Sequence, residues 1–325
     1  MRVFDLMIGA DFMVPDPDAT MTTFVKALGL REPKPQWRQA PQRHAYVAWF
    51  ARVHPSFAVA PTVIEPQGHR DLDQPDDPFF PQHLAELDRF QGGFRPHKLH
   101  ATLLATRDFD ELIGKLVRRR VPYRLAPTSE EMPMDRIWIG IPPESLRYDP
   151  SYDGGLAIEV LPLQALRLPD AALQDPPPEP RDAAPGEIIR VVARSHIVRD
   201  LDDTLRRVSL YLDWEPDGPV EVIAEEGYRR ARMRMGLRHS SVVELIEPFD
   251  GDSAVGRYLA TWGPGPYATR IAVTDLDAKR KDLEARGTGF TEMAPSAAVP
   301  GERIQVDPKA VENLLFEFVE YSPLS

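Results

Sequence analysis

The chain contains no cysteine among its 325 residues. Disulfides, thiolate metal sites and a cysteine nucleophile are therefore excluded, and the absence fits a reducing compartment. The sequence also lacks any apolar run near the ~20 residues of a membrane-spanning helix. Asp5 and Asp11 interrupt the apolar stretch at the start, so no signal peptide is expected. These absences predict a cytoplasmic protein that does not enter a membrane.

Positive charge is scarce relative to negative charge. The chain has 39 Lys and Arg against 50 Asp and Glu, a net charge of −11 and a pI near 5.3. A nucleic-acid binder usually shows a basic surface, so nucleic acid is not an expected partner. The sequence has no phosphate-binding P-loop, no dinucleotide-binding glycine pattern and no Gly-x-Ser-x-Gly motif. A small molecule is the expected partner.

What the chain does contain is a repeated unit. Each copy runs from an apolar strand through Asp-x-Asp into an amphipathic helix, and short strand-like runs follow. The third copy shows the helical stripe at Leu205, Val208 and Leu212. The first Asp of each pair, at Asp16, Asp108, Asp200 and Asp275, is expected to cap its helix. The four copies are "FMVPDPDATMTTFVKALGL", "LLATRDFDELIGKLVRRRVPY", "HIVRDLDDTLRRVSLYLDWEP" and "IAVTDLDAKRKDLEARGTGF".

A glutamate stands inside the last apolar strand of three units: Glu159 in "LAIEVLPLQ", Glu244 in "VVELIEPFD" and Glu317 in "LLFEFVEYS". In the first unit, aligning "VIEP" with "LIEP" places Thr62 in this position. A buried carboxylate is costly unless it is paired or bound to a cation. We therefore expect Glu244 and Glu317 to be enclosed, with either a metal or an Arg, Tyr or Trp donor within reach.

Proline-rich and polar segments divide the chain, which has 34 prolines. They predict units at 1–68, 97–164, 187–250 and 266–322, grouped into an N-terminal pair (1–164) and a C-terminal pair (187–325). The linker 69–96 contains "HLAELDRF", where a short helix is expected. The linker 165–186 has a proline run that favours an extended connector. The loop "WGPGPY" at 262–267 is expected to lead into the fourth unit.

With these units, the sequence resembles the vicinal oxygen chelate superfamily, which includes glyoxalase I, bleomycin-resistance proteins, methylmalonyl-CoA epimerase and type I extradiol dioxygenases. The resemblance covers nearly the whole chain and rests on "VPDPDAT…FVKALGL", "VRDLDDTLRR", "VTDLDAKRKDLEARG", "VVELIEP" and "LLFEFVEY". It implies an α+β fold of four βαβββ modules, paired into curved, barrel-like mixed sheets. It also implies a cleft in which His residues from first strands and Glu residues from last strands hold a divalent metal.

Carried over residue by residue, the resemblance implies a metal site. Fe²⁺ is favoured as the metal, with Mn²⁺, Ni²⁺ or Zn²⁺ as alternatives, and His100 and Glu159 are expected to point into one cleft. Gly9 and Ala268, seven residues before their Asp, occupy the place where the family's His commonly falls and cannot ligate through a side chain. A metal-free protein is therefore also left open. The implied ligands are His100, Glu159, His196, Glu244 and Glu317.

Three functions follow from the resemblance. The first is a metal-dependent enzyme acting on a small substrate with adjacent oxygens, most like an extradiol ring-cleaving dioxygenase. The second is a glyoxalase- or epimerase-like lyase or isomerase, with Glu244 as the catalytic base. The third is a metal-free protein that binds or sequesters a small molecule. Tyr148, in the loop "PPESLRYDPSYDGG", is expected to reach the substrate, and a homodimer is among the expected assemblies.

Overall fold

The computed structural model describes residues 3–39, 46–54, 62–69, 102–126, 128, 134–143, 148–174 and 183–322. His100 and the segment around "HLAELDRF" lie outside the described residues. No helix within these ranges is long and apolar enough to cross a membrane.

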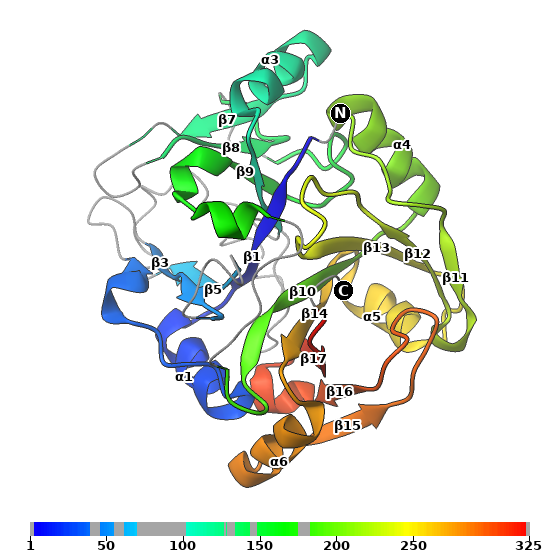
Figure 1. The fold of residues 1–325 in the computed structure, drawn as a ribbon. Coiled ribbons are helices and arrows are strands. Elements are labelled where there is room, and N and C mark those ends of the chain that lie inside the picture. The colour runs from blue at the N-terminus through cyan, green and yellow to red at the C-terminus, as the bar shows by residue number, and fades with distance from the viewer. Residues whose placement is uncertain are drawn as a thin grey trace. The chain divides into compact units, whose positions relative to one another are not determined.

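The elements follow the four predicted units (Figure 1). Module 1 contains β1 (Leu6–Met13), α1 (Pro17–Leu28), β2 (Arg38–Gln39), β3 (Tyr46–Trp49), β4 (Ala51–Arg52) and β5 (Val63–His69). Module 2 contains β6 (Thr102–Thr106), α3 (Phe109–Arg119), β7 (Tyr123–Ala126), β8 (Arg136–Ile139) and β9 (Ile158–Pro162). Module 3 contains β10 (Ile188–Ile197), α4 (Leu201–Leu212), β11 (Glu221–Ile223), β12 (Tyr228–Arg232) and β13 (Val242–Pro248). Module 4 contains β14 (Gly265–Val273), α6 (Leu276–Arg286), β15 (Phe290–Met293), β16 (Arg303–Val306) and β17 (Leu315–Glu320).

The strands form two mixed sheets. The first has the order β2-β3-β5-β1-β6-β9-β8-β7, with β4 also paired to β5, and the second has the order β11-β12-β13-β10-β14-β17-β16-β15. In modules 1, 2 and 4 the first strand pairs in parallel with the last strand, and the last strand pairs antiparallel with the strand before it. This is the βαβββ arrangement, so the predicted α+β fold class is confirmed.

Two compact units divide the chain in a different way from the sheets. One unit comprises Met1–Ile8, Lys98–Leu168 and Arg194–Pro266, which are essentially modules 2 and 3. The other comprises Gly9–His97, Pro169–Ala193 and Tyr267–Ser325, which are essentially modules 1 and 4. Each sheet thus takes its strands from consecutive modules, whereas each compact unit combines one module from each sheet. The boundaries drawn at the linkers stay a prediction.

Three of the four predicted helix caps are present. The side chains of Asp16, Asp200 and Asp275 accept hydrogen bonds from backbone N–H groups in the first turns of α1, α4 and α6. Asp108 makes no such side-chain bond, although it occupies the same position before α3. The predicted cap is wrong there, and Asp108 contributes its backbone carbonyl to Leu112 instead.

Each compact unit contains a pair of packed helices. In the second unit the carbonyls of Ala27 and Leu28, at the end of α1, accept hydrogen bonds from Thr288, just after α6, and from Lys279 of α6. Lys279, almost fully buried, donates to the Leu28 carbonyl at 2.5 Å and to Asp282 at 2.9 Å. In the first unit Lys115 and Arg119 of α3 both pair with Asp213, which follows α4. In the second unit, side chains of module 4 therefore satisfy carbonyls at the C-terminal end of α1, whereas in the first unit the two helices are joined by ion pairs.

The connections differ in detail from the sequence-based expectations. Residues Ala254–Trp262 form an additional helix, α5, between modules 3 and 4. Gly265 to Tyr267 already belong to β14, where a loop is expected. Short 3₁₀ turns occur at Pro35–Trp37, Leu163–Leu166, Asp170–Leu173, Ala224–Glu226 and Pro308–Val311. Two of these turns lie in or beside the proline-rich connector.

Candidate functional site

The last-strand glutamates share one position in their modules. Glu159 pairs in register with Leu103, and Glu317 pairs with Arg270. Both first-strand partners stand five residues before the Asp that precedes the helix. The same register in module 1 pairs Glu65 with Asp11, five residues before Asp16. Glu65, and not Thr62, is therefore the equivalent residue, and the prediction that module 1 lacks this glutamate is wrong.

Glu244 is buried and has donors on two strands. Arg230 Nη1 on β12 lies 3.0 Å from Glu244 Oε1, and Ser195 Oγ on β10 donates to Oε2 at 2.9 Å. Arg230 is buried as well and pairs with Glu221 at 2.7 Å. The expectation that Glu244 is enclosed with an arginine within reach is confirmed. These contacts are those of a structural ion pair. The catalytic role of Glu244 stays a prediction.

Glu317 is held in a similar way by two arginines. Arg270 Nε on β14 donates to Glu317 Oε2 at 3.1 Å, and Arg303 Nε on β16 lies 3.5 Å from Oε1. All three side chains are largely buried. The expectation of an enclosed carboxylate with cationic donors is confirmed here too.

Glu159 is buried but its arginine stands further away. Arg136 Nε on β8 lies 3.8 Å from Glu159 Oε1, beyond hydrogen-bonding distance. The Arg136 guanidinium carbon lies over the Trp138 ring, 5.0 Å from its centroid, in a cation–π contact. Burial raises the pKa of Glu159, while the charge of Arg136 and the Trp138 indole act in the opposite direction. Among the three diagonal arginine–glutamate pairs, Arg136 and Glu159 are therefore the furthest apart.

The arginines follow a repeated register. In each of modules 2 to 4, the strand that runs antiparallel to the last strand carries one residue directly opposite the glutamate. An arginine lies two residues before that opposite residue. In module 1 this position is Ala48, opposite Gln67. The diagonal pairs are Arg136 with Glu159, Arg230 with Glu244 and Arg303 with Glu317. We refer to the sheet face that carries each pair as the glutamate face of its module.

His196 is turned away from the glutamate face. Ser195 Oγ reaches Glu244, so the neighbouring side chain in the strand points to the opposite face. There His196 Nε2 lies 3.0 Å from Thr102 Oγ1, whose hydroxyl proton is donated to the Leu156 carbonyl. The hydroxyl therefore accepts a bond from Nε2–H. Burial and the nearby charge of Arg194 lower the pKa of His196 to about 3, so its ring is neutral.

The first-strand positions where the resemblance implies histidine carry small residues. Gly9, Ala193 and Ala268 each stand seven residues before the Asp of their module. Ala268 lies two residues before Arg270, and Ala193 two before Ser195, so both belong to the glutamate face. None of these residues has a side chain that can bind a metal.

The described members of the predicted ligand set do not fit a divalent metal. Their carboxylates lie beside guanidinium groups, and His196 faces away from Glu244. Within the described ranges, no group of three or more His, Asp or Glu side chains converges as metal ligands would. His100 lies outside those ranges, so its predicted pairing with Glu159 stays a prediction.

Tyr148 lies in a loop that is fastened to its own module. Its hydroxyl donates to Asp153 Oδ1 at 2.5 Å and accepts from the Ala157 N–H at 3.1 Å. Burial and the negative charge of Asp153 raise the pKa of Tyr148 well above its usual value. Burial also raises the pKa of Asp153 to about 6. The role predicted for Tyr148 in binding substrate stays a prediction, and its contacts are those of a loop anchor.

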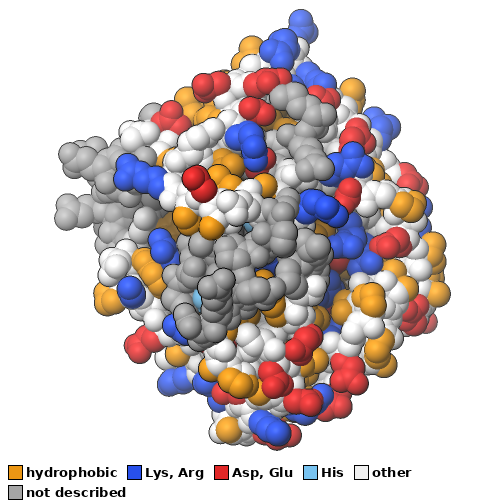
Figure 2. All heavy atoms as spheres, viewed as in Figure 1, with side chains coloured by type: hydrophobic (Ala, Val, Ile, Leu, Met, Phe, Trp, Pro, Cys, Tyr) orange, Lys and Arg blue, Asp and Glu red, His pale blue; other side chains and the backbone are white. Residues whose placement is uncertain are grey.

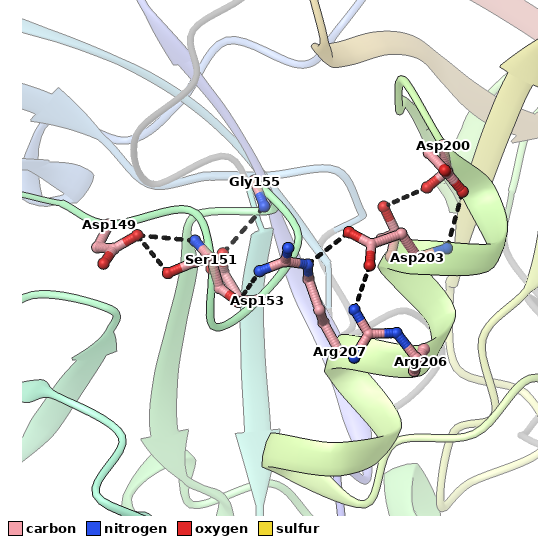
Figure 3. A network of polar contacts seen from close by, with 9 residues as sticks. Asp149, Ser151, Asp153, Gly155, Asp200, Asp203, Arg206 and Arg207 are labelled. Atoms are coloured by element: carbon pink, nitrogen blue, oxygen red, sulfur yellow. Dashed lines mark hydrogen bonds and ion pairs between the residues drawn. The ribbon is translucent and has the colours of Figure 1, made fainter.

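The same loop packs on the N-terminal half of α4 (Figure 3). Arg207 Nη1 donates to the Ser151 carbonyl at 2.9 Å and its Nε to Asp203 at 2.5 Å. Gly154 approaches α4 so closely that an added Cβ would lie 2.4 Å from Thr204 Cγ2. Modules 2 and 3 are thus joined within the first compact unit by backbone contacts as well as by ion pairs.

The exterior of the described residues carries both signs of charge. Acidic and basic side chains are scattered together over the face drawn in Figure 2. That face therefore has no single sign of charge in its described part.

The strand order and the four βαβββ modules agree with the fold that the resemblance to the vicinal oxygen chelate superfamily implies. Solved structures that resemble the chain include Streptomyces coelicolor methylmalonyl-CoA epimerase in complex with 2-nitronate-propionyl-CoA, with 26% identity over 41% of this chain and 96% of that one and a TM-score of 0.36. Mycobacterium tuberculosis methylmalonyl-CoA epimerase matches with 24% identity over 42% of this chain and 90% of that one, at a TM-score of 0.37. A hypothetical protein from Bacillus halodurans matches with 21% identity over 41% and 94%, also at 0.37.

No protein-family model matches the chain, and no curated protein sequence matches it. At TM-scores near 0.37 the structural likeness carries no argument about activity.

Proposed function

We propose that the protein binds a small organic molecule and does so without a divalent metal at its last-strand glutamates. The observation that carries this proposal is the arginine placed diagonally opposite the glutamate in three modules. A guanidinium beside a carboxylate supplies the cation that the buried charge needs, and its positive charge repels a metal ion. The Gly and Ala residues at Gly9, Ala193 and Ala268 support the same conclusion.

Metal analysis of the purified protein tests the proposal. We expect well below one equivalent of Fe, Mn, Ni or Zn per chain, and no change in thermal midpoint when any of these ions is added. Stoichiometric metal that is lost in both the Glu159→Ala and Glu244→Ala variants would overturn it. The ring-cleaving reaction depends on an iron site, and the described residues of the predicted ligand set do not supply one.

A second candidate function is proton transfer at a carbon beside a carbonyl group. It is favoured by the state of Glu159, whose pKa is raised by burial and whose arginine is not hydrogen-bonded to it. A carboxylate with a raised pKa is a better general base near neutral pH. Incorporation of solvent deuterium into small carbonyl compounds, abolished in Glu159→Gln, would establish this activity. No incorporation would leave binding as the function.

A further inference from the structure

Arg136 differs from the two arginines that share its register. Arg230 donates to both Glu244 and Glu221, and Arg303 donates to Ser296 while lying near Glu317. Arg136 Nε and Arg303 Nε are both buried without a hydrogen-bond partner in the described part of the chain. Arg136 differs in its separation from its glutamate, 3.8 Å from Glu159 against 3.5 Å for Arg303 and Glu317. The side chain of Arg136 is also more exposed, at 17% against 4% for Arg230 and 2% for Arg303.

The Trp138 ring supports the Arg136 guanidinium, whose carbon lies over the ring at 5.0 Å from its centroid. A guanidinium stacked over an aromatic ring by its flat face keeps its N–H groups at the edge, in the plane of the fork. That edge matches the two oxygens of a carboxylate, which a guanidinium binds through two parallel hydrogen bonds. Trp138 is 5% exposed, so the ring both supports the guanidinium and lowers the polarity beside it.

The charges on this face favour an anion. In the register of module 2, Arg124 lies opposite Trp138, and Trp138 lies opposite Glu159. Residues paired in this way project to the same face of the sheet. The glutamate face of module 2 thus carries two arginines and one glutamate, and burial disfavours the charged form of that glutamate.

We propose that Arg136, lying over the Trp138 ring and beside Glu159, is the point at which the protein binds the carboxylate of its small-molecule ligand. This proposal rests on the proposed function and names the chemical class of the ligand. The ligand carboxylate supplies the hydrogen-bond acceptors for Arg136 Nε and its neighbouring N–H groups. Glu159 sets the selectivity, since its negative charge opposes the ligand and its protonated form donates to it.

Benzoate is a suitable probe, with neutral benzamide as its isostere and inorganic phosphate as a non-planar anion. Binding to the wild-type protein is followed by calorimetry and by tryptophan fluorescence. We expect benzoate to bind more tightly than either alternative, because only a planar carboxylate matches the guanidinium fork. Equal binding of benzamide and benzoate would overturn the proposal, and tighter binding of phosphate would reassign the ligand class.

Variants identify the residue. Arg136→Gln is expected to weaken benzoate binding by about tenfold or more, and Arg136→Lys by a smaller factor because lysine keeps the charge without the fork. Arg118→Gln removes one exposed positive charge from α3 and is expected to leave binding unchanged. Glu159→Gln is expected to tighten binding, which a purely structural ion pair would not do. Wild-type affinity in a folded Arg136→Gln protein, or no tightening in Glu159→Gln, would refute the assignment.

The two proposals fail in distinguishable ways. A metal-free protein that binds no benzoate at millimolar concentration would retain the proposed function and lose the ligand assignment. A protein with stoichiometric metal would lose the proposed function, whatever its affinity for benzoate. If Arg136→Gln does not fold, the Glu159→Gln and Arg136→Lys titrations still decide the matter.

Discussion

Among single residues, Arg230 and Glu244 form the buried pair whose contribution is easiest to measure. Replacing Arg230 with Met leaves Glu244 buried with only part of its hydrogen bonding. Removing one partner of a buried pair typically costs about 3–5 kcal/mol of unfolding free energy. We expect Arg230→Met to fall in this range, measured by urea denaturation.

The double variant Arg230→Met with Glu244→Leu provides the control. Replacing both partners with apolar groups of similar volume is often neutral or stabilising. We expect it to recover most of the stability lost in Arg230→Met. If the double variant is as unstable as the single one, the arginine acts through contacts other than Glu244.

The hydrogen bonds of the Tyr148 hydroxyl should stabilise the loop, and removing the hydroxyl of nearby Tyr152 is the matched control. Tyr148→Phe removes the bond to Asp153 and leaves the Ala157 N–H without its acceptor. We expect a loss of about 1–3 kcal/mol in unfolding free energy. Tyr152 packs against the Tyr211 ring at 5.2 Å, and Tyr152→Phe keeps that contact, so its stability should change little. Loss of ligand binding in a stable Tyr148→Phe protein would instead support the predicted substrate role.

Asp153 is expected to give a measurable pH dependence. Burial raises its pKa from 3.8 to about 6, so between these values the folded protein holds a proton that the unfolded chain releases. Its contribution to stability is therefore lost as the pH rises from about 4 to about 6. Relative to Asp153→Asn, the wild-type protein should lose stability across this window and no further above it. An unchanged difference, measured by urea denaturation at several pH values, would contradict the raised pKa.

Part of this residue-level account could be predicted from the sequence. The apolar neighbours of Glu244 and Glu317 indicated burial and a need for donors. The identity of the donors could not be predicted, because it depends on which residues face each other across two strands. One signal was present, since Arg230 precedes Glu244 by 14 residues and Arg303 stands at the same spacing before Glu317. In module 2 the connection between β8 and β9 is longer, so Arg136 and Glu159 do not have this spacing.

At the scale of elements, the contact between the 148–155 loop and α4 can be tested with two adjacent glycines. Gly154 and Gly155 both have positive φ, at 72° and 88°, so alanine strains the backbone at either position. Only at Gly154 would the new Cβ meet α4, whereas at Gly155 its nearest neighbour is 3.9 Å away. We expect Gly154→Ala to cost about 1–3 kcal/mol more than Gly155→Ala in thermal or urea unfolding. Equal losses would show that the loop yields without disturbing α4.

The helices were predictable where the sequence marks their starts or gives them an apolar stripe. The Asp-x-Asp pairs located the starts of α1, α3, α4 and α6, and an apolar stripe supported α3 and α4 as well, because local sequence determines a helix and its start. The register of β5 was not predictable in this way. The motif "IEP" occurs in both module 1 and module 3, yet the strands place Glu65 and Glu247 three residues apart in their modules. Strand register is set by tertiary pairing, which a shared tripeptide does not reveal.

For the whole molecule, the composition of the compact units predicts how fragments behave. Residues 1–168 contain modules 1 and 2, which belong to different units, so this fragment completes neither. We expect it to show no cooperative thermal transition alone, and to regain one when mixed with residues 169–325, which supply the rest of both units. Near-ultraviolet circular dichroism is the measurement. A cooperative transition of the isolated fragment at the full-length midpoint would show that two modules of one sheet suffice.

The side chains that join α1 to α6 have a consequence for the order of synthesis. Lys279 lies 251 residues after its acceptor Leu28, and Ser240 lies 233 residues after Met7, whose N–H it accepts. Contacts so distant along the chain form late and slow folding. A nascent chain emerging from the ribosome therefore exposes the apolar surfaces of modules 1 and 2 until most of the C-terminal half has been translated. The residues of the first unit are complete once Pro266 has been made, whereas those of the second unit extend to Ser325. Translation interrupted between these points would therefore leave the apolar surface of module 1 uncovered and the product prone to aggregation.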